Sequence, residues 1–234
     1  MKELLKSLPV VGPVARRVAR LFRPAPAAEA PFERSDLYWD RRYRGGGNSG
    51  KGSYDHFATF KAEVLNDFVR ERGVTSVIEF GCGDGNQLTL AEYPSYLGHD
   101  VSEKAVELCR ERFAGHDTKS FVSDAGYDGQ TADLALSLDV IYHLVEDAVF
   151  EAYMARLFDA AGRFVVIYSS NTDDNPDPRP DHVRDRRFTD WVTARRPGWK
   201  LARHLPNRYP HDPAEGTGSR ADFFFFERDP AAAG

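Results

Sequence analysis

The chain has 234 residues, of which 41% are hydrophobic, which is enough to bury one sizeable core and short for two. Its 31 basic and 36 acidic residues give a formal net charge of -5 at pH 7, so there is no global positive field to hold a nucleic-acid backbone, and we expect no nucleic-acid partner. Two cysteines are too few for a disulfide framework, and no apolar run is long enough to cross a bilayer, which together predict a cytoplasmic protein.

Residues 1–31 are predicted to lie outside the folded domain. Apolar residues recur at roughly helical spacing between positions 4 and 21 among several basic residues, and residues 24–31 form a Pro/Ala linker that cannot continue a helix. Two interpretations of this extension stay open: a loosely ordered basic segment, and an amphipathic helix that makes weak contact with a membrane surface or docks on a partner. The folded domain is then expected to span residues 32–234.

An aromatic and basic stretch opens the domain and leads into a glycine-rich segment, residues 45–53. Its glycines and Lys51 invite comparison with a phosphate-binding loop. That interpretation fails, because no buried strand precedes the segment and Gly52 stands where such a loop requires Ser or Thr. Residues 56–72 then place apolar side chains on one helical face, and Gly73 is positioned to end that helix.

Strands and helices alternate over the rest of the chain. The sequence predicts strands at residues 74–80, 96–99, 119–122, 132–138 and 163–168, with helices at 84–93, 103–113 and 146–160. Two further strands, at 199–205 and 222–227, are expected to form an antiparallel hairpin. The alternation predicts an α/β fold, a doubly wound parallel sheet with helices on both faces and ligands bound beyond the carboxyl ends of the strands.

The turn after the first predicted strand carries the clearest binding signal. Residues 79–85 read E-F-G-C-G-D-G, and the glycines let the backbone bend tightly and approach a ligand. Asp100 follows the next strand about twenty residues later, where a carboxylate can hold both hydroxyls of a ribose. Together these features indicate an adenosine-containing cofactor. A dinucleotide fingerprint needs G-x-G-x-x-G, and Gly85 comes one position too early, which disfavours a nicotinamide-dependent oxidoreductase.

Residues 77–85, with the sequence V-I-E-F-G-C-G-D-G, resemble the first motif of the class I S-adenosylmethionine (SAM)-dependent methyltransferases. Residues 98–102, 123–125 and 136–144 resemble later motifs of the same family. The resemblance implies a Rossmann-like, seven-stranded sheet whose last strand is antiparallel, with SAM as the cofactor. It also implies a set of cofactor-binding residues, namely Glu79, Gly81, Cys82, Gly83, Asp100, Val101, Asp124, Ala125, Leu138 and Arg42.

The same resemblance assigns roles within that set. Glu79 and the first glycines would surround the methionine end of the cofactor, and Asp100 would hold the ribose. Asp124 would face the adenine amine. The segment from residue 38 to 43 and beyond resembles the lid that such enzymes fold over cofactor and acceptor, so that Arg42 or Tyr43 is expected to contact the methionine carboxylate.

Methyl transfer to a hydroxyl needs a group that removes the proton, and His143 is the predicted base. Asp139 lies four residues earlier and is expected to orient its imidazole. The alternative is that His143 only caps or packs the start of the following helix. A second hypothesis places a metal at this edge, because Asp139 and Asn171 follow different strands and offer the oxygen ligands that Mg²⁺ prefers.

The stretch between residues 38 and 87 also resembles a bacterial subgroup of these methyltransferases that is encoded among polysaccharide genes. That resemblance implies a hydroxyl of a sugar or oligosaccharide, such as a mannoside, as the acceptor. Tyr142, His182 and Arg184 are the predicted acceptor-binding residues, and residues 171–191 either roof the acceptor pocket or form a solvated loop. Two other functions stay open, a methyltransferase for another small molecule and a non-catalytic SAM-binding module.

Overall fold

The structure is a computed structural model that describes residues 31–230. Most of the predicted N-terminal extension, including its amphipathic helix, therefore lies outside the described residues. Residues 32–230 form one compact unit. Between residues 31 and 230, no helix combines the length and the apolar character needed to cross a membrane.

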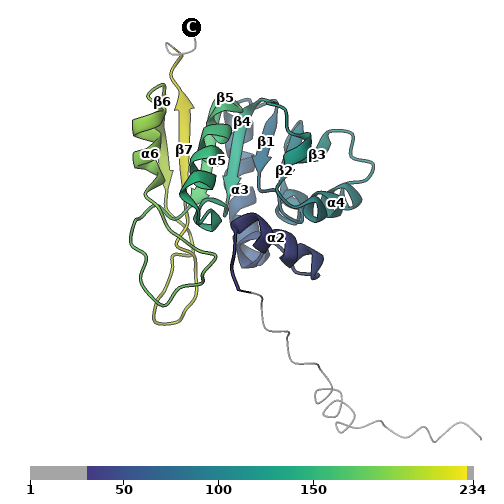
Figure 1. Ribbon diagram of the computed structural model, residues 1–234. Coiled ribbons are helices and arrows are strands. Elements are labelled where there is room, and N and C mark those ends of the chain that lie inside the picture. Colours follow the sequence, from purple (N-terminus) through teal and green to yellow (C-terminus); the bar gives the residue numbers. More distant parts are fainter. Residues whose placement is uncertain (1–30, 231–234) are drawn as a thin grey trace, which may run out of the picture. The chain divides into compact units, whose positions relative to one another are not determined.

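A seven-stranded sheet with the strand order β3-β2-β1-β4-β5-β7-β6 forms the centre of the domain (Figure 1). Its five parallel strands are β1 (Val77–Phe80), β2 (Tyr96–Asp100), β3 (Lys119–Ser123), β4 (Ala132–Leu138) and β5 (Ala161–Ser169). The last strand, β7 (Asp222–Arg228), pairs antiparallel with both β5 and β6 (Trp199–Leu205). The predicted seven-stranded sheet with an antiparallel last strand is confirmed.

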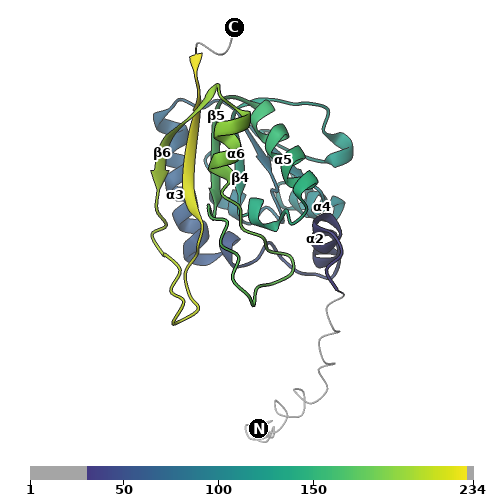
Figure 2. The same cartoon turned by 60° about the vertical axis from the view of Figure 1, so that its left-hand side comes forward.

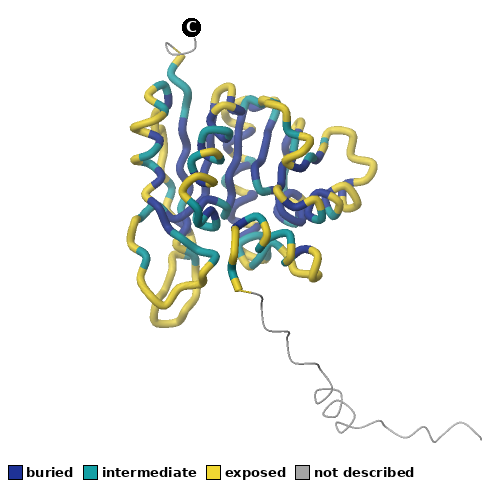
Figure 3. The backbone as a smooth tube through the Cα atoms, viewed as in Figure 1, coloured by how far each residue is buried: buried dark blue, intermediate teal, exposed yellow. Residues whose placement is uncertain are grey.

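Helices cover both faces of the sheet (Figure 2). One face packs against α3 (Asp55–Glu71) and α4 (Glu103–Arg112), and the other against α5 (Asp147–Asp159) and α6 (Phe188–Arg195). Both faces of the sheet are apolar because successive side chains of a strand point to opposite faces, as strand β7 shows. Phe223 and Phe225 join the first cluster, whereas Phe224 and Phe226 join the second. Strands β1, β2, β4, β5 and β7 are accordingly mostly buried (Figure 3), whereas β6 at the edge of the sheet is mostly exposed.

The helix predicted over residues 84–93 is wrong. The structure has a turn there, followed by one short 3-10 helix, η2 (Gln87–Leu90). Gly85 adopts a φ of 71°, outside the right-handed helical region, and Asp84 accepts hydrogen bonds from the Asn86 N–H (3.0 Å) and the Tyr54 hydroxyl (2.6 Å). The bond to Asn86 closes a local turn that competes with a helix, and the bond from Tyr54 holds Asp84 from a distant part of the chain. The glycine loop is therefore followed by a turn rather than by a helix N-terminus.

The short helix α6 was missed by the prediction, which left residues 171–191 without regular structure. It begins only at Phe188, after the three prolines at 176, 178 and 180. Phe188 and Val192 are buried against the sheet. Tertiary packing therefore stabilises a helix that is too short to be predicted from the spacing of its apolar residues.

Helix α2 (Ser35–Arg44) lies across the carboxyl ends of the parallel strands (Figure 1). Its first residue bonds to Glu146, which precedes α5, with the Ser35 N–H and hydroxyl donating over 3.0 and 2.6 Å. In its middle, Asp40 accepts a 2.9 Å bond from the hydroxyl of Ser102, which follows β2. Ser102 is also the N-cap of α4, since its side-chain oxygen accepts from the Ala105 N–H (3.4 Å). Helix α2 therefore covers the edge where ligands bind in this type of sheet.

Candidate active site

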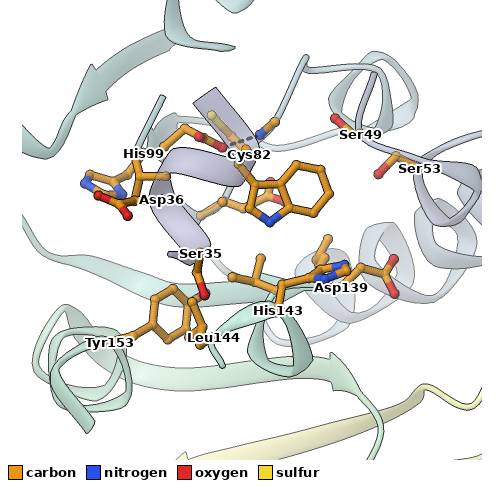
Figure 4. A pocket seen from close by; sticks show the side chains of 18 of the residues that line it. Ser35, Asp36, Ser49, Ser53, Cys82, His99, Asp139, His143, Leu144 and Tyr153 are labelled. Carbon is orange, nitrogen blue, oxygen red and sulfur yellow. Dashed lines mark hydrogen bonds between the residues drawn. The ribbon is translucent and has the colours of Figure 1, made fainter. Parts of the chain in front are cut away.

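A cavity of about 120 Å³ lies between α2 and the ends of β1, β2 and β4 (Figure 4). It brings together seven of the ten predicted cofactor residues, namely Glu79, Gly81, Cys82, Gly83, Asp100, Val101 and Leu138. The predicted catalytic residues Asp139 and His143 line the same cavity. Residues that are distant in the sequence thus surround one space.

The glycine loop after β1 holds the buried carboxylate of Asp100. The Gly83 N–H donates to Asp100 Oδ2 over 2.9 Å, and the Ser102 N–H donates to Oδ1 over 2.9 Å. Gly83 has a φ of 58°, and a Cβ atom there would come within 2.9 Å of the Tyr43 hydroxyl. Burial raises the pKa of Asp100, and the two backbone donors oppose this rise. Position 83 therefore needs glycine, and the Asp100 carboxylate is fixed at the wall of the cavity.

A buried ion pair stands beside Glu79, and the sequence did not indicate it. Lys61 of α3 is fully buried, and its Nζ contacts Asp139 Oδ2 at 2.6 Å. Asp139 adopts a φ of 60°, and its Oδ1 accepts from the Tyr142 hydroxyl over 2.8 Å. Glu79 accepts from the Tyr96 hydroxyl over 2.7 Å, and burial raises its pKa to about 7. This end of the cavity thus offers both acidic groups and a cation.

Gln87 provides a test of whether this end suits a ligand with hydrogen-bond donors. Its side chain lines the cavity, its Nε2 donates to the Ala58 carbonyl (3.0 Å), and its Oε1 is buried without a hydrogen-bond partner. A buried acceptor without a donor costs free energy that a ligand donor would recover. The residues therefore fit the amino-acid end of SAM, which carries an ammonium group, a carboxylate and a positively charged sulfur.

Asp124 does not face the cavity, contrary to the expectation for the adenine side. Its Oδ1 accepts from His99 Nε2 (3.0 Å) and Arg156 Nη1 (2.6 Å), and the hydrogen bond from His99, together with Arg156, lowers its pKa to about 2. His99 and Arg156 line the cavity instead, while Asp124 and Ala125 do not. In Figure 4, His99 and Tyr153 lie on the left, and Asp139 and Ser53 lie on the right. Asp124 thus acts on the cavity through its two partners.

His143 is half-buried and is held by a backbone carbonyl rather than by Asp139. Its Nδ1 lies 3.0 Å from the carbonyl oxygen of His182, which can only accept, so Nδ1 carries the proton. Burial lowers the pKa of His143 to about 4, which leaves the imidazole neutral and its Nε2 without a proton at pH 7. The structure shows the Asp139 carboxylate bonded to Lys61 and Tyr142, and the His143 Nδ1 bonded to the His182 carbonyl.

Of the other predicted acceptor-side and lid residues, Tyr43 lines the cavity, whereas His182, Arg184 and Arg42 do not. His182 stacks on Tyr38 with ring centroids 4.3 Å apart. Arg184 donates to the Val145 carbonyl over 3.0 Å and pairs with an acidic residue of α5. Arg42 donates to the Asn48 carbonyl over 2.7 Å, whereas Tyr43, its predicted alternative, lines the cavity.

The metal hypothesis lacks support from the donor set. Both carboxylate oxygens of Asp139 already have partners, and the Asn171 amide bonds with Thr189 (3.0 Å). Across residues 31–230, no group of three or more His, Cys, Asp or Glu side chains is arranged to hold a metal ion. The predicted pair of Asp139 and Asn171 therefore does not form a Mg²⁺ site in this structure.

The sequence and the fold were each compared with known proteins. Residues 78–166 match the family described as a methyltransferase domain. No curated protein matches the chain.

Several solved structures share the fold. The N-methyltransferase NodS from Bradyrhizobium japonicum WM9, in complex with S-adenosyl-L-homocysteine (SAH), is 13% identical with a TM-score of 0.63, and the match covers 84% of this chain and 99% of NodS. The magnesium protoporphyrin IX methyltransferase ChlM from Synechocystis PCC 6803, with bound SAM, is 18% identical with a TM-score of 0.58 and coverages of 86% and 100%. The methyltransferase domain of bacterial CtHen1-C is 21% identical with a TM-score of 0.56 and coverages of 72% and 96%. From the sequence match and the shared fold, the chain is a SAM-dependent methyltransferase built on the class I methyltransferase fold.

Proposed function

We propose that this enzyme transfers a methyl group from SAM to a hydroxyl of a sugar or oligosaccharide, with His143 as the general base. The observation that carries the proposal is that Asp100 and His143 line one cavity. Asp100 is a fixed acceptor for ribose hydroxyls, and His143 has an unprotonated Nε2. A cofactor anchor and a base therefore belong to one site.

The cavity lining suggests how the cofactor is held. Asp100 binds the ribose, and His99 and Tyr153 flank the adenine side. At the other end, Glu79 accepts from the ammonium group, and Lys61 takes the methionine carboxylate in place of Arg42, which does not line the cavity. When bound, SAM supplies a methyl group on a positively charged sulfur.

His143 accepts the proton that the acceptor hydroxyl loses as the new bond forms. Its Nδ1–H remains bonded to the His182 carbonyl, which stabilises the imidazolium. Trp39 of α2 meets the imidazole edge-on with centroids 4.8 Å apart, and this contact helps to exclude water from the base. The base and the ring that covers it therefore come from different elements, His143 from the 3-10 helix at Ile141–His143 and Trp39 from α2.

A carbohydrate acceptor is supported by the resemblance of residues 38–87 and by the rings beside the base. Tyr38 stacks on His182, and His182 stacks on His143 at 5.4 Å. Aromatic faces combined with hydrogen-bonding groups are suited to a ligand with both apolar and hydroxyl surfaces. The outer part of the site therefore favours a sugar over a purely apolar molecule.

The test is transfer of a labelled methyl group from SAM to a panel of mannosides, other glycans, phenols and amines, with Mg²⁺ and with chelator. We expect transfer to a glycan, and a loss of about 10²–10⁴-fold in kcat for His143→Ala with little change in SAH affinity. His204→Ala, an exposed histidine on β6, is the matched control and should retain activity. Transfer only to phenols or amines would contradict the sugar acceptor, and SAM binding without transfer to any acceptor would favour a non-catalytic module. Activity that disappears on chelation would restore the metal hypothesis.

A further inference from the structure

Gln87 is tethered at one end and unsatisfied at the other. It follows the glycine loop in η2, and its Nε2 donates to the Ala58 carbonyl of α3 over 3.0 Å. This bond fixes which end of the amide is oxygen, because a carbonyl can only accept. The remaining atom, Oε1, is buried without a donor among the described residues.

The neighbourhood of Gln87 indicates which kind of donor is missing. Gln87 lines the cavity together with Glu79, Lys61 and Ser53, at the end where the buried ion pair lies. Lys61 Nζ contacts Asp139 and the Tyr96 hydroxyl donates to Glu79, and neither group donates to the Gln87 oxygen. A ligand can supply the missing donor, and a cationic donor is favoured by the acidic Glu79 in the same cavity.

We propose that Gln87 is a specificity-determining residue for the methyl donor, whose α-amino group donates a hydrogen bond to Gln87 Oε1. The inference rests on the proposed function in one respect, that the cavity binds SAM. Beyond that function, the inference assigns the amino group a neutral acceptor, the Gln87 amide oxygen, whose hydrogen bond does not depend on pH through ionisation of Gln87. Glu79 contributes to the same group only when it is ionised.

The experiment compares two ligands by isothermal titration calorimetry on the full chain at pH 8. One is SAH, and the other is its desamino analogue, in which hydrogen replaces the α-amino group. The wild type should bind SAH more tightly than the analogue. Gln87→Met preserves length and volume but removes the acceptor, and it should reduce that preference about tenfold, equivalent to about 1.4 kcal/mol. Gln87→Glu loses the donor to the Ala58 carbonyl but retains an acceptor oxygen, so it should show at least the wild-type preference.

Asn66→Leu is the matched control. Asn66 ties α3 to the same η2 segment, donating to the Leu90 carbonyl (2.9 Å) and accepting from the Glu92 N–H (3.0 Å), but it does not line the cavity. Its ratio of SAH to analogue affinity should equal that of the wild type, and thermal melts show whether each variant is folded. Both affinities in each ratio are measured on the same variant. A general loosening of the site weakens both ligands equally and therefore leaves the ratio unchanged.

Two results would count against the proposal in distinguishable ways. An unchanged preference in folded Gln87→Met overturns the role of Gln87 while leaving the proposed function intact. Failure of the wild type to bind either ligand removes the proposed function, and this inference with it. A repeat at pH 6 adds a second readout: the loss caused by Gln87→Met should be the same at both pH values.

Discussion

Glu79 and His143 show how burial gives two ionisable groups of one cavity unusual protonation states. Burial disfavours the charged form of each, so it raises the pKa of the carboxyl group to about 7 and lowers the pKa of the imidazole to about 4. The acid is therefore half protonated near neutral pH, whereas the histidine is a neutral base. These opposite shifts make separate predictions for binding and for catalysis.

Binding of SAH should strengthen as pH rises through 7. The pKa of Glu79 is about 7 in the free protein, and an ammonium group beside it favours the carboxylate, so the pKa falls in the complex. Below pH 7 binding must then release a proton, and affinity should rise about tenfold between pH 6 and pH 8. Calorimetry in buffers of different ionisation enthalpy measures that proton release. Glu79→Gln should remove the pH dependence, and a wild-type affinity that falls over this range would contradict the account.

The catalytic rate should have no acidic limb near the ordinary pKa of histidine. Because the pKa of His143 is lowered to about 4, its Nε2 remains unprotonated down to about pH 5. The dependence of kcat on pH at saturating SAM and acceptor should therefore be flat between pH 6 and pH 7. A fall in kcat with an apparent pKa between 6 and 7 that persists in Glu79→Gln would argue against a buried, neutral His143.

At the scale of elements, α2 determines access to the cavity. Its start is held through Ser35, which bonds to Glu146 and accepts from the Val145 N–H over 3.1 Å. Its middle and end are held through Asp40 and Tyr43, the latter 3.0 Å from Ser49 Oγ. These are a few hydrogen bonds rather than a large apolar contact, so α2 can release the site at modest cost.

Loosening the start of α2 should therefore impair function more than stability. Ser35→Ala removes the hydroxyl bonds to Glu146 and to the Val145 N–H, and it should raise KM for SAM severalfold while lowering the free energy of unfolding by about 1 kcal/mol. Thr59→Ala, an exposed hydroxyl on α3, is the control and should leave KM unchanged. Steady-state kinetics and thermal melts measure the two effects. An unchanged KM in Ser35→Ala would mean that α2 is not held through this residue.

The sequence predicted most elements because their signals are local. Strands β4 (Ala132–Leu138) and β7 (Asp222–Arg228) follow from apolar runs. The turn after β1 was mistaken for a helix because the competing bonds of Asp84 reach to Tyr54, thirty residues away, and such contacts leave no periodic trace.

Several site residues were predictable because they lie at or just after strand ends. Glu79, Asp100 and Asp139 could be found in this way, because the carboxyl ends of parallel strands meet at one edge. Lys61 and Gln87 could not, since one lies on the buried face of α3 and the other in a turn predicted as a helix. Their roles depend on tertiary neighbours that the sequence does not place.

At the scale of the whole molecule, two apolar layers hold the sheet between its helices. Phe225 of β7 is buried in the layer under α3, where its ring lies 5.0 Å from that of Phe68. Phe224 and Phe226 point into the other layer. A single strand therefore contributes to both halves of the core, through side chains that do not line the cavity under α2.

Truncating one of these rings should reduce stability without changing the chemistry of the site. Phe225→Ala leaves a cavity in the core and should lower the free energy of unfolding by about 3–5 kcal/mol. Leu201→Ala on the neighbouring strand β6 is the control, because Leu201 is 47% exposed and should cost less than about 0.5 kcal/mol. Urea denaturation measures both values. Similar losses in the two variants would mean that β7 does not form part of the core.

The most direct test of the central claim is calorimetric titration of SAM and SAH into the wild type and into Asp100→Ala. Asp100 is held in the cavity by the N–H groups of Gly83 and Ser102 and is expected to accept from the ribose hydroxyls. The wild type should bind both ligands at one site, and the folded variant should bind them about 10- to 100-fold more weakly, as expected for lost hydrogen bonds to a charged group. Absence of binding by the wild type, or equal affinity in the folded variant, would contradict the assignment of this cavity as the cofactor site.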